Sequence, residues 1–219
     1  RTGTEMDAFW LYEAEGLFQT AGEITSRGIT QSWGALQPGD IRYADLNGDN
    51  TVNEFDVHAT DYHSPRVFYG VNLSAGYKGF SIYALGQGEA DGNVMLSNNR
   101  YFMVNGTQQN YSELMLDRFP VTNDYPRLTT VSQNNYQYST FWVAKAAYFR
   151  LKNIEVSYTV PVAASRRLAM DNLRIFARGT NLAAISSLKK YSVDPENLDA
   201  GITGYPLFRT ITAGVSCKF

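Results

Sequence analysis

Residues 67–79 read V-F-Y-G-V-N-L-S-A-G-Y-K-G and alternate apolar side chains with small or polar ones. A period of two places successive side chains on opposite faces of an extended chain, which is the mark of a β-strand. One face carries Val67, Tyr69, Val71, Leu73, Ala75 and Tyr77, and the other carries Gly70, Asn72, Ser74, Gly76 and Lys78. The alternation returns over residues 153–160, 173–180 and 207–219, and more weakly over residues 80–90 and 8–18. The sequence therefore predicts an all-β protein of antiparallel strands.

The length of the expected strands separates two kinds of β protein. The clearest strands run for about ten to thirteen residues, whereas a strand in a soluble sandwich typically has about five or six. A β-strand that crosses a membrane needs about 9–11 residues. The second face of these strands is rich in Gly, Ser, Thr and Asn, which suits a water-filled lumen better than a dry core. Length and polarity together favour a transmembrane β-barrel.

The connections between the expected strands alternate between long and short. Residues 77–80 form a two-residue hairpin candidate, and residues 161–172 form a moderate turn with room for a short helical piece over residues 163–170. The long polar connections cover residues 19–65, 91–140 and 183–205. Membrane barrels have short periplasmic turns and long outer loops, so this asymmetry places every long connection outside the cell.

The number of strands indicates that the chain is part of something larger. We expect about six strands, whereas a transmembrane barrel needs at least about eight to close. An open sheet edge in lipid would leave backbone N–H and C=O groups unpaired, at a cost of several kcal/mol each. The barrel must therefore be completed by more of the same polypeptide or by other chains.

Composition excludes several other classes of protein. The 219 residues include 19 Lys and Arg against 21 Asp and Glu, for a net charge of -2, so the basic excess of a nucleic-acid binder is missing. The single cysteine, Cys217, excludes an intrachain disulfide and a cysteine-built zinc site. The sequence contains no recognisable nucleophile–base motif, Walker loop or dinucleotide fingerprint, so we do not expect an enzyme.

Residues 45–56 read D-L-N-G-D-N-T-V-N-E-F-D, which is similar to the calcium loop of an EF-hand. The candidate metal ligands are Asp45, Asn47, Asp49, the Thr51 carbonyl, Asn53 and Asp56. The sixth position holds Asn50 instead of Gly, and the last holds Asp instead of Glu, which weakens the preference for calcium over magnesium. We expect a structural Ca²⁺ ion, with Mg²⁺ as the alternative, that rigidifies an extracellular loop. A surface turn without an ion is the competing interpretation.

Two further groups of residues carry weaker signals. His58, Asp61 and His63 could bind a transition metal or could be solvated side chains. Aromatic and amide side chains in the long loops suit sugar or peptide ligands, or pack against neighbouring loops. This second group contains Tyr101, Phe102, Asn105, Gln108, Gln109, Asn110, Tyr111, Asn134, Asn135, Tyr136 and Tyr138. Neither group identifies the residues that bind substrate.

The order of short motifs along the chain resembles a known family. These motifs are Gly16-Leu17-Phe18-Gln19, Pro38–Tyr43, Asp45–Asp49, Tyr77–Phe80, Tyr148–Ile154, Tyr158–Pro161, Asn181-Leu182, Asp194-Pro195-Glu196, Tyr205-Pro206 and the terminal Phe219. Together they resemble the C-terminal part of SusC/RagA-like TonB-dependent outer-membrane transporters of Bacteroidetes-type bacteria. The resemblance covers nearly all of residues 1–219.

The resemblance implies a barrel of about 22 strands that surrounds an N-terminal plug. It implies that the plug domain and the TonB contact lie outside this chain, and that residues 1–219 supply part of the barrel wall. The implied partners are a SusD-like surface lipoprotein, the rest of the barrel and its plug, TonB and outer-membrane lipid. The implied cargo is an oligosaccharide or a peptide, and Phe219 resembles the C-terminal signal for barrel assembly.

A second class of protein competes with this interpretation. A secreted, calcium-stabilised β-sandwich that binds glycans would explain the acidic loop over residues 45–56 and the loop aromatics. It would not explain the long strands or the long connections on one side of the sheet.

Overall fold

The computed structural model describes residues 3–96, 113–129, 132–198 and 207–218. The chain forms two compact units. The first unit comprises Arg1–Ser64, Asn93–Lys145 and Ala200–Thr203, and the second comprises Pro65–Gly92, Ala146–Asp199 and Gly204–Phe219. No helix within the described residues is both long enough and apolar enough to span a membrane.

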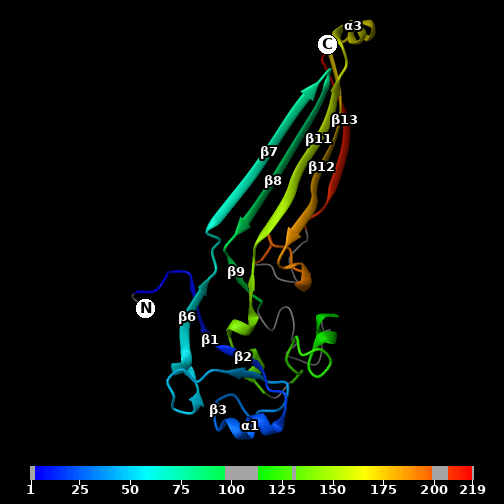
Figure 1. Ribbon diagram of the computed structural model, residues 1–219. Coiled ribbons are helices and arrows are strands. Elements are labelled where there is room, and N and C mark those ends of the chain that lie inside the picture. The colour runs from blue at the N-terminus through cyan, green and yellow to red at the C-terminus, as the bar shows by residue number, and fades with distance from the viewer. Residues whose placement is uncertain (1–2, 97–112, 130–131, 199–206, 219) are drawn as a thin grey trace. The chain divides into compact units, whose positions relative to one another are not determined.

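The second unit is an antiparallel sheet of five strands in the order β13-β12-β11-β8-β7 (Figure 1). Its strands are β7 (Val67–Tyr77), β8 (Phe80–Ala90), β11 (Tyr148–Thr159), β12 (Asn172–Ser186) and β13 (Thr210–Lys218). They contain 9 to 15 residues each, which confirms the prediction of long strands. The all-β class predicted from the alternation is also confirmed.

The hairpin between β7 and β8 has the predicted two-residue turn. Lys78 and Gly79 both have positive φ angles, 46° and 86°, as a type I′ turn requires. This turn matches the right-handed twist of the strands it joins. Gly79 is also required by space, because a Cβ atom there would lie 2.7 Å from the Thr159 carbonyl oxygen.

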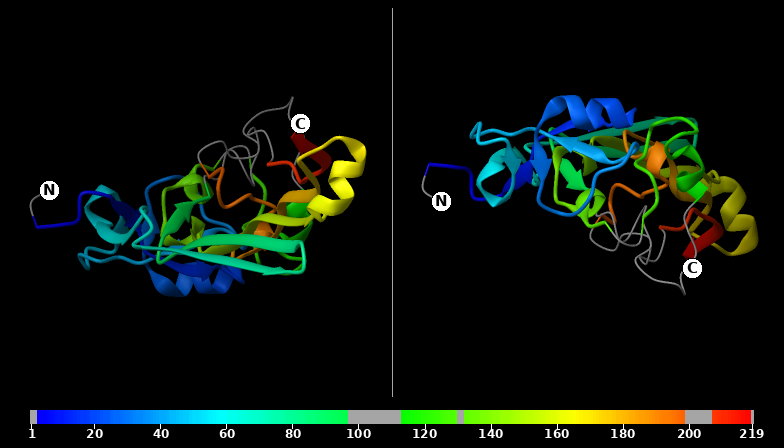
Figure 2. Two further views of the ribbon diagram at one scale, coloured as in Figure 1. Left: turned by 90° about the horizontal axis from the view of Figure 1, so that it is seen from above. Right: turned by 90° about the horizontal axis from the view of Figure 1, so that it is seen from below.

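The connection between β11 and β12 contains the predicted helical piece. It consists of helix α3 (Val162–Ser165) and the 3₁₀ turn η5 (Arg166–Leu168). Pro161 precedes the helix and Ala169 ends it in a left-handed conformation, with φ 57°. Figure 2 shows this yellow turn beside the red end of β13, where the Asp171 N–H donates to the Lys218 carbonyl.

A β-bulge keeps one face of β11 apolar along its whole length. The register to both neighbouring strands shifts between Leu151 and Asn153. Odd-numbered Phe149 and Leu151 share the apolar face before the bulge, and even-numbered Ile154 shares it afterwards. Because a shift of one residue reverses the faces of a strand, the bulge compensates for the change of phase in the sequence.

The first unit is built from short elements around a small core. Helix α1 (Ala21–Arg27) and the 3₁₀ turns η1 (Glu54–Asp56), η2 (Glu113–Asp117), η3 (Asn134–Tyr136) and η4 (Thr140–Trp142) join four strand pairs. These pairs are β1 (Ala8–Tyr12) with β6 (Val57–Tyr62), β2 (Ala14–Leu17) with β4 (Ile41–Tyr43), β3 (Thr30–Gln31) with β5 (Thr51–Val52), and β9 (Asn93–Met95) with β10 (Val143–Lys145). The core includes Leu11, Phe18, Ile41, Tyr43, Val52, Leu96 and Trp142.

Two sequence-based expectations need correction. Residues 8–18 do not add a sixth strand to the long sheet, because β1 and β2 pair with β6 and β4 in the first unit. The alternation at residues 8–18 marks extended chain but cannot identify the strand with which it pairs. The connection over residues 19–65 is not simply a long polar loop either, since its short strands bury apolar side chains such as Ile41 and Val52.

Candidate functional site

The two faces of the long sheet differ in chemistry. Rows of paired residues cross all five strands, so the face of each side chain follows from the register. One such row is Leu73, Ala84, Ile154, Gly179 and Ile211, and the next is Ala75, Ile82, Val156, Ala177 and Ala213. This apolar face is open: the outer members Leu73 and Ile211 are 65% and 79% exposed.

The opposite face carries hydroxyl, amide and charged groups. Its rows include Ser74, Tyr83, Glu155, Arg178 and Thr212, and also Asn72, Leu85, Asn153, Thr180 and Thr210. We call the two sides the apolar face and the polar face of the sheet. A sheet whose apolar face is left open requires an apolar surrounding, because each Å² of apolar surface kept from water is worth about 25 cal/mol.

Glu155 is the centre of an ion cluster on the polar face. Its Oε2 accepts hydrogen bonds from Arg178 Nε at 2.8 Å and Nη2 at 2.5 Å, and its Oε1 pairs with Arg174 Nη2. Arg174 also donates to the Ser157 hydroxyl at 3.1 Å. Two cations therefore share one carboxylate.

A second ion cluster fastens a segment to the polar face near the start of β11. Residues 187–198, called here the strap, follow β12 and include the 3₁₀ turn η6 (Lys189–Tyr191). Arg150 donates to Asp194 Oδ1 at 2.6 Å, and Lys152 Nζ lies 2.9 Å from both oxygens of Glu196. The Tyr148 hydroxyl lies 3.1 Å from the same Glu196 carboxylate. Two motifs that are distant in the sequence, Tyr148–Ile154 and Asp194–Glu196, thus meet in space.

Backbone hydrogen bonds and a buried leucine also fix the strap, in addition to its ion pairs. The Ser187 N–H donates to the Ala147 carbonyl at 3.0 Å, and Leu188 is fully buried. Near the other end, the Glu196 N–H donates to Asp194 Oδ1 at 3.0 Å, which forms an Asx-type turn. The first of these contacts joins the strap to the residue before β11, and the second shapes the strap where its carboxylates meet Arg150 and Lys152.

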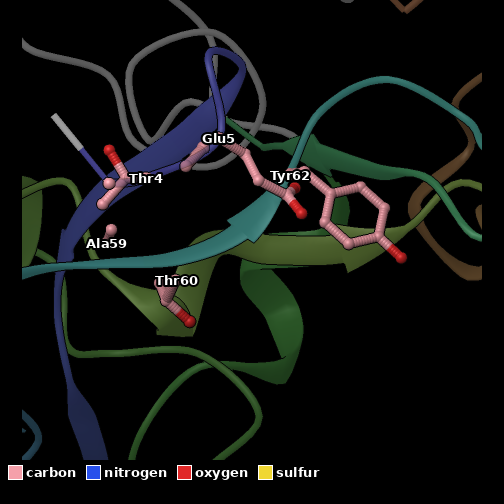
Figure 3. Close-up of a pocket in the computed structure, with 7 residues that line it drawn as sticks. Thr4, Glu5, Ala59, Thr60 and Tyr62 are labelled. Carbon is pink, nitrogen blue, oxygen red and sulfur yellow. The ribbon is translucent and has the colours of Figure 1, made fainter.

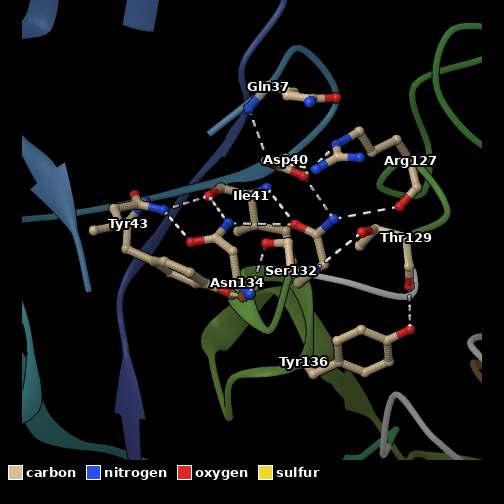
Figure 4. A network of polar contacts seen from close by, with 11 residues as sticks. Gln37, Asp40, Ile41, Tyr43, Arg127, Thr129, Ser132, Asn134 and Tyr136 are labelled. Atoms are coloured by element: carbon tan, nitrogen blue, oxygen red, sulfur yellow. Dashed lines mark hydrogen bonds and ion pairs between the residues drawn. The ribbon is translucent and has the colours of Figure 1, made fainter. Parts of the chain in front are cut away.

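The first unit contains a buried polar network (Figure 4). The Asp40 carboxylate pairs with Arg127 Nε at 2.6 Å and accepts from Asn135 Nδ2 at 2.9 Å. Asn134 Nδ2 donates to the Ile41 carbonyl at 2.8 Å. Because buried polar groups are costly unless they are paired, this network ties residues 31–43 to residues 127–135. Burial raises the pKa of Tyr43, whose hydroxyl donates to the Asn134 carbonyl at 2.8 Å.

The network decides the role of two loop amides. From the sequence, Asn134 and Asn135 are candidates either for ligand binding or for packing between loops. In the structure both side chains are fully buried among protein atoms. They belong to the packing of the first unit, whereas Tyr138 is 64% exposed. The loop candidates between Tyr101 and Tyr111, and also Phe219, lie outside the described residues.

All six candidate metal ligands lie in one compact loop. The Asp45 carboxylate accepts from the backbone N–H groups of Gly48 and Asn50, each at 2.7 Å, and Asp49 Oδ1 accepts from Thr51 at 2.8 Å. Asn50 has φ 64°, the left-handed conformation expected at the position where an EF-hand has Gly. The side chains thus support the loop backbone from inside.

Asp56 closes this loop. It is fully buried, and its Oδ1 accepts from Leu46 at 2.8 Å while its Oδ2 accepts from Asn53 at 2.9 Å. Oδ1 also accepts from the Asn47 N–H at 3.3 Å, so backbone N–H groups use both of its lone pairs and only Oδ2 keeps one for an ion. Metal binding by the loop stays a prediction.

The histidine cluster finds no support. Nowhere in the described residues, the loop over residues 45–56 included, do three His, Cys, Asp or Glu side chains form a group that could hold a metal ion. His58 Nε2 lies 3.5 Å from Glu13, and the His63 ring packs edge-on against Phe9 with the centroids 5.9 Å apart.

A pocket of about 370 Å³ lies in the first unit (Figure 3). Small and hydroxyl side chains line it together with the carboxylate of Glu5. The lining residues are Gly3, Thr4, Glu5, Ala8, Ala59, Thr60 and Tyr62. These residues do not include a nucleophile with an adjacent base, so the pocket does not suggest catalysis.

Comparison with known proteins agrees with this geometry. No family model matches the chain. The chain is similar to TonB-dependent receptor P3 of Formosa agariphila, with 23% identity over 232 residues that cover 100% of this chain and 23% of the relative. The chain thus spans less than a quarter of this relative's length.

Solved structures show the same fold. The RagAB peptide transporter matches with a TM-score of 0.69 and 20% identity, over 97% of this chain and 22% of that chain. The RagAB peptide importer in its "closed-closed" state matches with a TM-score of 0.68 and 20% identity, over 97% of this chain and 23% of that chain.

The chain is similar over its whole length to part of a TonB-dependent receptor, and it has the fold of part of RagAB. The resemblance to SusC/RagA-like transporters seen in the sequence is therefore confirmed. Proteins of this class lie in the outer membrane, so the predicted localisation is confirmed at that level. The relative and the solved structures carry the names of a receptor and of transporters rather than of enzymes, in agreement with the expectation from sequence.

Proposed function

We propose that this chain is a stretch of barrel wall in an outer-membrane TonB-dependent transporter. The apolar face of the sheet contacts lipid, and the polar face lines an aqueous passage. The observation that carries this proposal is the continuous apolar face, which is exposed along β7 and β13. The free edges of β7 and β13 pair with further strands of the same barrel, because unpaired edges are not tolerated in lipid.

A secreted β-sandwich would require a second sheet against the apolar face. A sandwich covers the apolar face of one sheet with a second sheet about 10 Å away. In the described part of the second unit the five strands form a single sheet. The large side chains on the apolar face, such as Val71 and Val215, are exposed.

We further propose that the transporter imports oligosaccharides or peptides together with a SusD-like surface lipoprotein, using TonB and a plug domain. The support is the family resemblance and the similarity to RagAB, which is described as a peptide transporter. The chain spans only 22% of that structure, so cargo and partners depend mostly on residues outside it.

We also propose that the loop over residues 45–56 binds a structural Ca²⁺ or Mg²⁺ ion. The support is the spacing of its oxygen ligands and the left-handed Asn50. The ion would fix the loop backbone and take no part in transport chemistry.

Adjacent residues on opposite faces provide a sharp test of the barrel proposal. Leu73→Arg places a charge on the apolar face, and its neighbour Ser74→Arg places the same charge on the polar face. An arginine that faces lipid near the middle of the membrane costs about 2–4 kcal/mol. In the full-length transporter we expect Leu73→Arg to reduce the heat-modifiable barrel in outer-membrane fractions, while Ser74→Arg assembles normally. Equal behaviour of the two variants would contradict the proposal.

A further inference from the structure

The Glu155 cluster is unbalanced in charge. Arg174 and Arg178 are four residues apart on β12 and therefore lie on the same face of the sheet. Both guanidinium groups reach the one carboxylate of Glu155. The rows that hold these three residues contribute Ser, Thr and Tyr side chains, and the row between them contributes Ser, Gly and Phe. None of these rows carries a second carboxylate. Two positive charges thus face one negative charge.

The two arginines also have hydrogen-bond donors to spare. A guanidinium has five N–H donors in a fixed plane. The side chains of Arg174 and Arg178 are 42% and 51% exposed, whereas that of Glu155 is 11% exposed. The buried carboxylate therefore holds the inner side of each guanidinium, and the outer side remains open.

The guanidinium groups of Arg174 and Arg178 both lie over the ring of Phe176. Its ring centroid is 5.7 Å from the Arg174 Cζ and 5.8 Å from the Arg178 Cζ, so both cations approach the same ring. Across the strand pair, the ring lies over Gly214, where a Cβ atom would come within 2.5 Å of it. Glycine at this position lets the ring lie close to the sheet, and the two cations converge above it.

We propose that Arg174 and Arg178 form a binding site for a second carboxylate on the polar face. The new carboxylate would bridge the outer sides of the two guanidinium groups and bring the cluster to two positive and two negative charges. Charge-assisted hydrogen bonds of this kind are short and strong. This inference rests on the proposed function, in which the polar face lines the passage. The carboxylate comes either from another part of the transporter or from the cargo.

Charge balance distinguishes this site from a simple three-residue cluster. If a second carboxylate is present, Arg174→Gln leaves two negative charges on one cation, and Glu155→Gln leaves two cations on one negative charge. Both variants should then lower the temperature at which the full-length transporter loses its folded mobility on gels, by similar amounts. Without a second carboxylate, Arg174→Gln leaves one cation paired with one carboxylate, so the temperature at which it loses its folded mobility should equal or exceed that of the wild type. Glu155→Gln alone should then lower this temperature. Arg167→Gln, an exposed arginine in η5, is the matched control.

A second arm of the experiment covers a carboxylate supplied by cargo. The full-length transporter is tested for binding a short peptide with a free C-terminal carboxylate and the same peptide as its amide. If the cargo supplies the group, Arg174→Gln should leave the unliganded transporter stable and reduce the preference for the acid at least tenfold. A stable Arg174→Gln variant with an unchanged preference would overturn the proposal.

The barrel proposal is checked separately in the same preparations. Wild-type protein that is absent from the outer-membrane fraction would contradict the proposed function itself. If the wild-type protein is present there and Arg174→Gln changes neither the stability nor the peptide preference, only the proposal of the carboxylate site is contradicted.

Discussion

Arg150 on β11 forms an ion pair with Glu196 in the strap, with Arg150 Nε 3.0 Å from Glu196 Oε2. Arg150 is only 5% exposed at its side chain, and Lys152 and Tyr148 contact the same Glu196 carboxylate. A charge that is buried this far depends on its partner, because solvent cannot replace the lost contact. The pair therefore holds the strap against the polar face.

We expect Glu196→Gln to release the strap. The substitution removes one of the two carboxylates that contact the buried Arg150 and leaves Asp194, at a cost of about 1.5–3 kcal/mol. Hydrogen exchange in the full-length transporter should show faster exchange of residues 187–198 with little change in β7. Glu54→Gln, which removes an exposed carboxylate in the first unit, is the control. Unchanged protection of the strap would show that Leu188 and the local turns hold it without the ions.

Cys217, the single cysteine of residues 1–219, reports which face contacts lipid. Cys217 pairs with Leu173 on the apolar face and is exposed, whereas its neighbour Ser216 pairs with Arg174 on the polar face. In intact outer membranes we expect Cys217 to react with a lipid-soluble maleimide and to resist a charged one. A Ser216→Cys variant in a Cys217→Ser background should show the reverse preference. Rapid labelling of Cys217 by the charged reagent would place water on the apolar face.

The buried phenol of Tyr43 should contribute to the stability of the first unit. Tyr43→Phe removes the hydrogen bond to the Asn134 carbonyl and leaves that carbonyl without this partner, at a cost of about 1–3 kcal/mol. Exchange of the β4 amides should become faster in this variant. Tyr138→Phe changes an exposed hydroxyl and should have no such effect.

The same residue predicts a change at alkaline pH. Burial raises the pKa of Tyr43 above the ordinary value of 10.0, so the folded protein keeps this phenol protonated where the unfolded chain ionises. The stabilisation is complete below about pH 10 and declines as the pH rises further. Protection of β4 should therefore fall above about pH 10 more steeply in the wild type than in Tyr43→Phe. Parallel slopes would indicate that other groups cause the alkaline loss.

The acidic loop provides a test of ion binding. We expect Asp45→Ala and Asp49→Ala to abolish binding of Ca²⁺ in calorimetric titration of the full-length transporter and to speed proteolysis within residues 45–56, while the barrel stays intact. Removal of the ion with a chelator should have the same effect on the wild type. Glu54→Gln alters a carboxylate of the same loop that is not among the predicted ligands, so it should bind normally. Wild-type protein that releases no heat with Ca²⁺ or Mg²⁺ would exclude the site.

Features set by local spacing could be predicted from the sequence. Alternation over residues 67–79 assigned Val71 and Leu73 to one face, and the two-residue turn at Lys78 and Gly79 followed from the short gap between two apolar runs. Both depend on backbone geometry within a few residues, so no knowledge of distant contacts was needed. The motifs that resemble the transporter family were likewise readable in order along the chain.

Features that depend on pairing partners needed the tertiary structure. Residues 8–18 alternate like a strand of the sheet, yet they pair with β6 and β4, because alternation does not specify a partner. The contacts of Arg150 with Glu196, and of Arg174 and Arg178 with Glu155, arise from strand register and chain folding. The sequence by itself therefore determined the class of fold and the two chemical faces, because both are local patterns. Only the tertiary structure decided which charges meet on the polar face, because that depends on residues far apart in the chain.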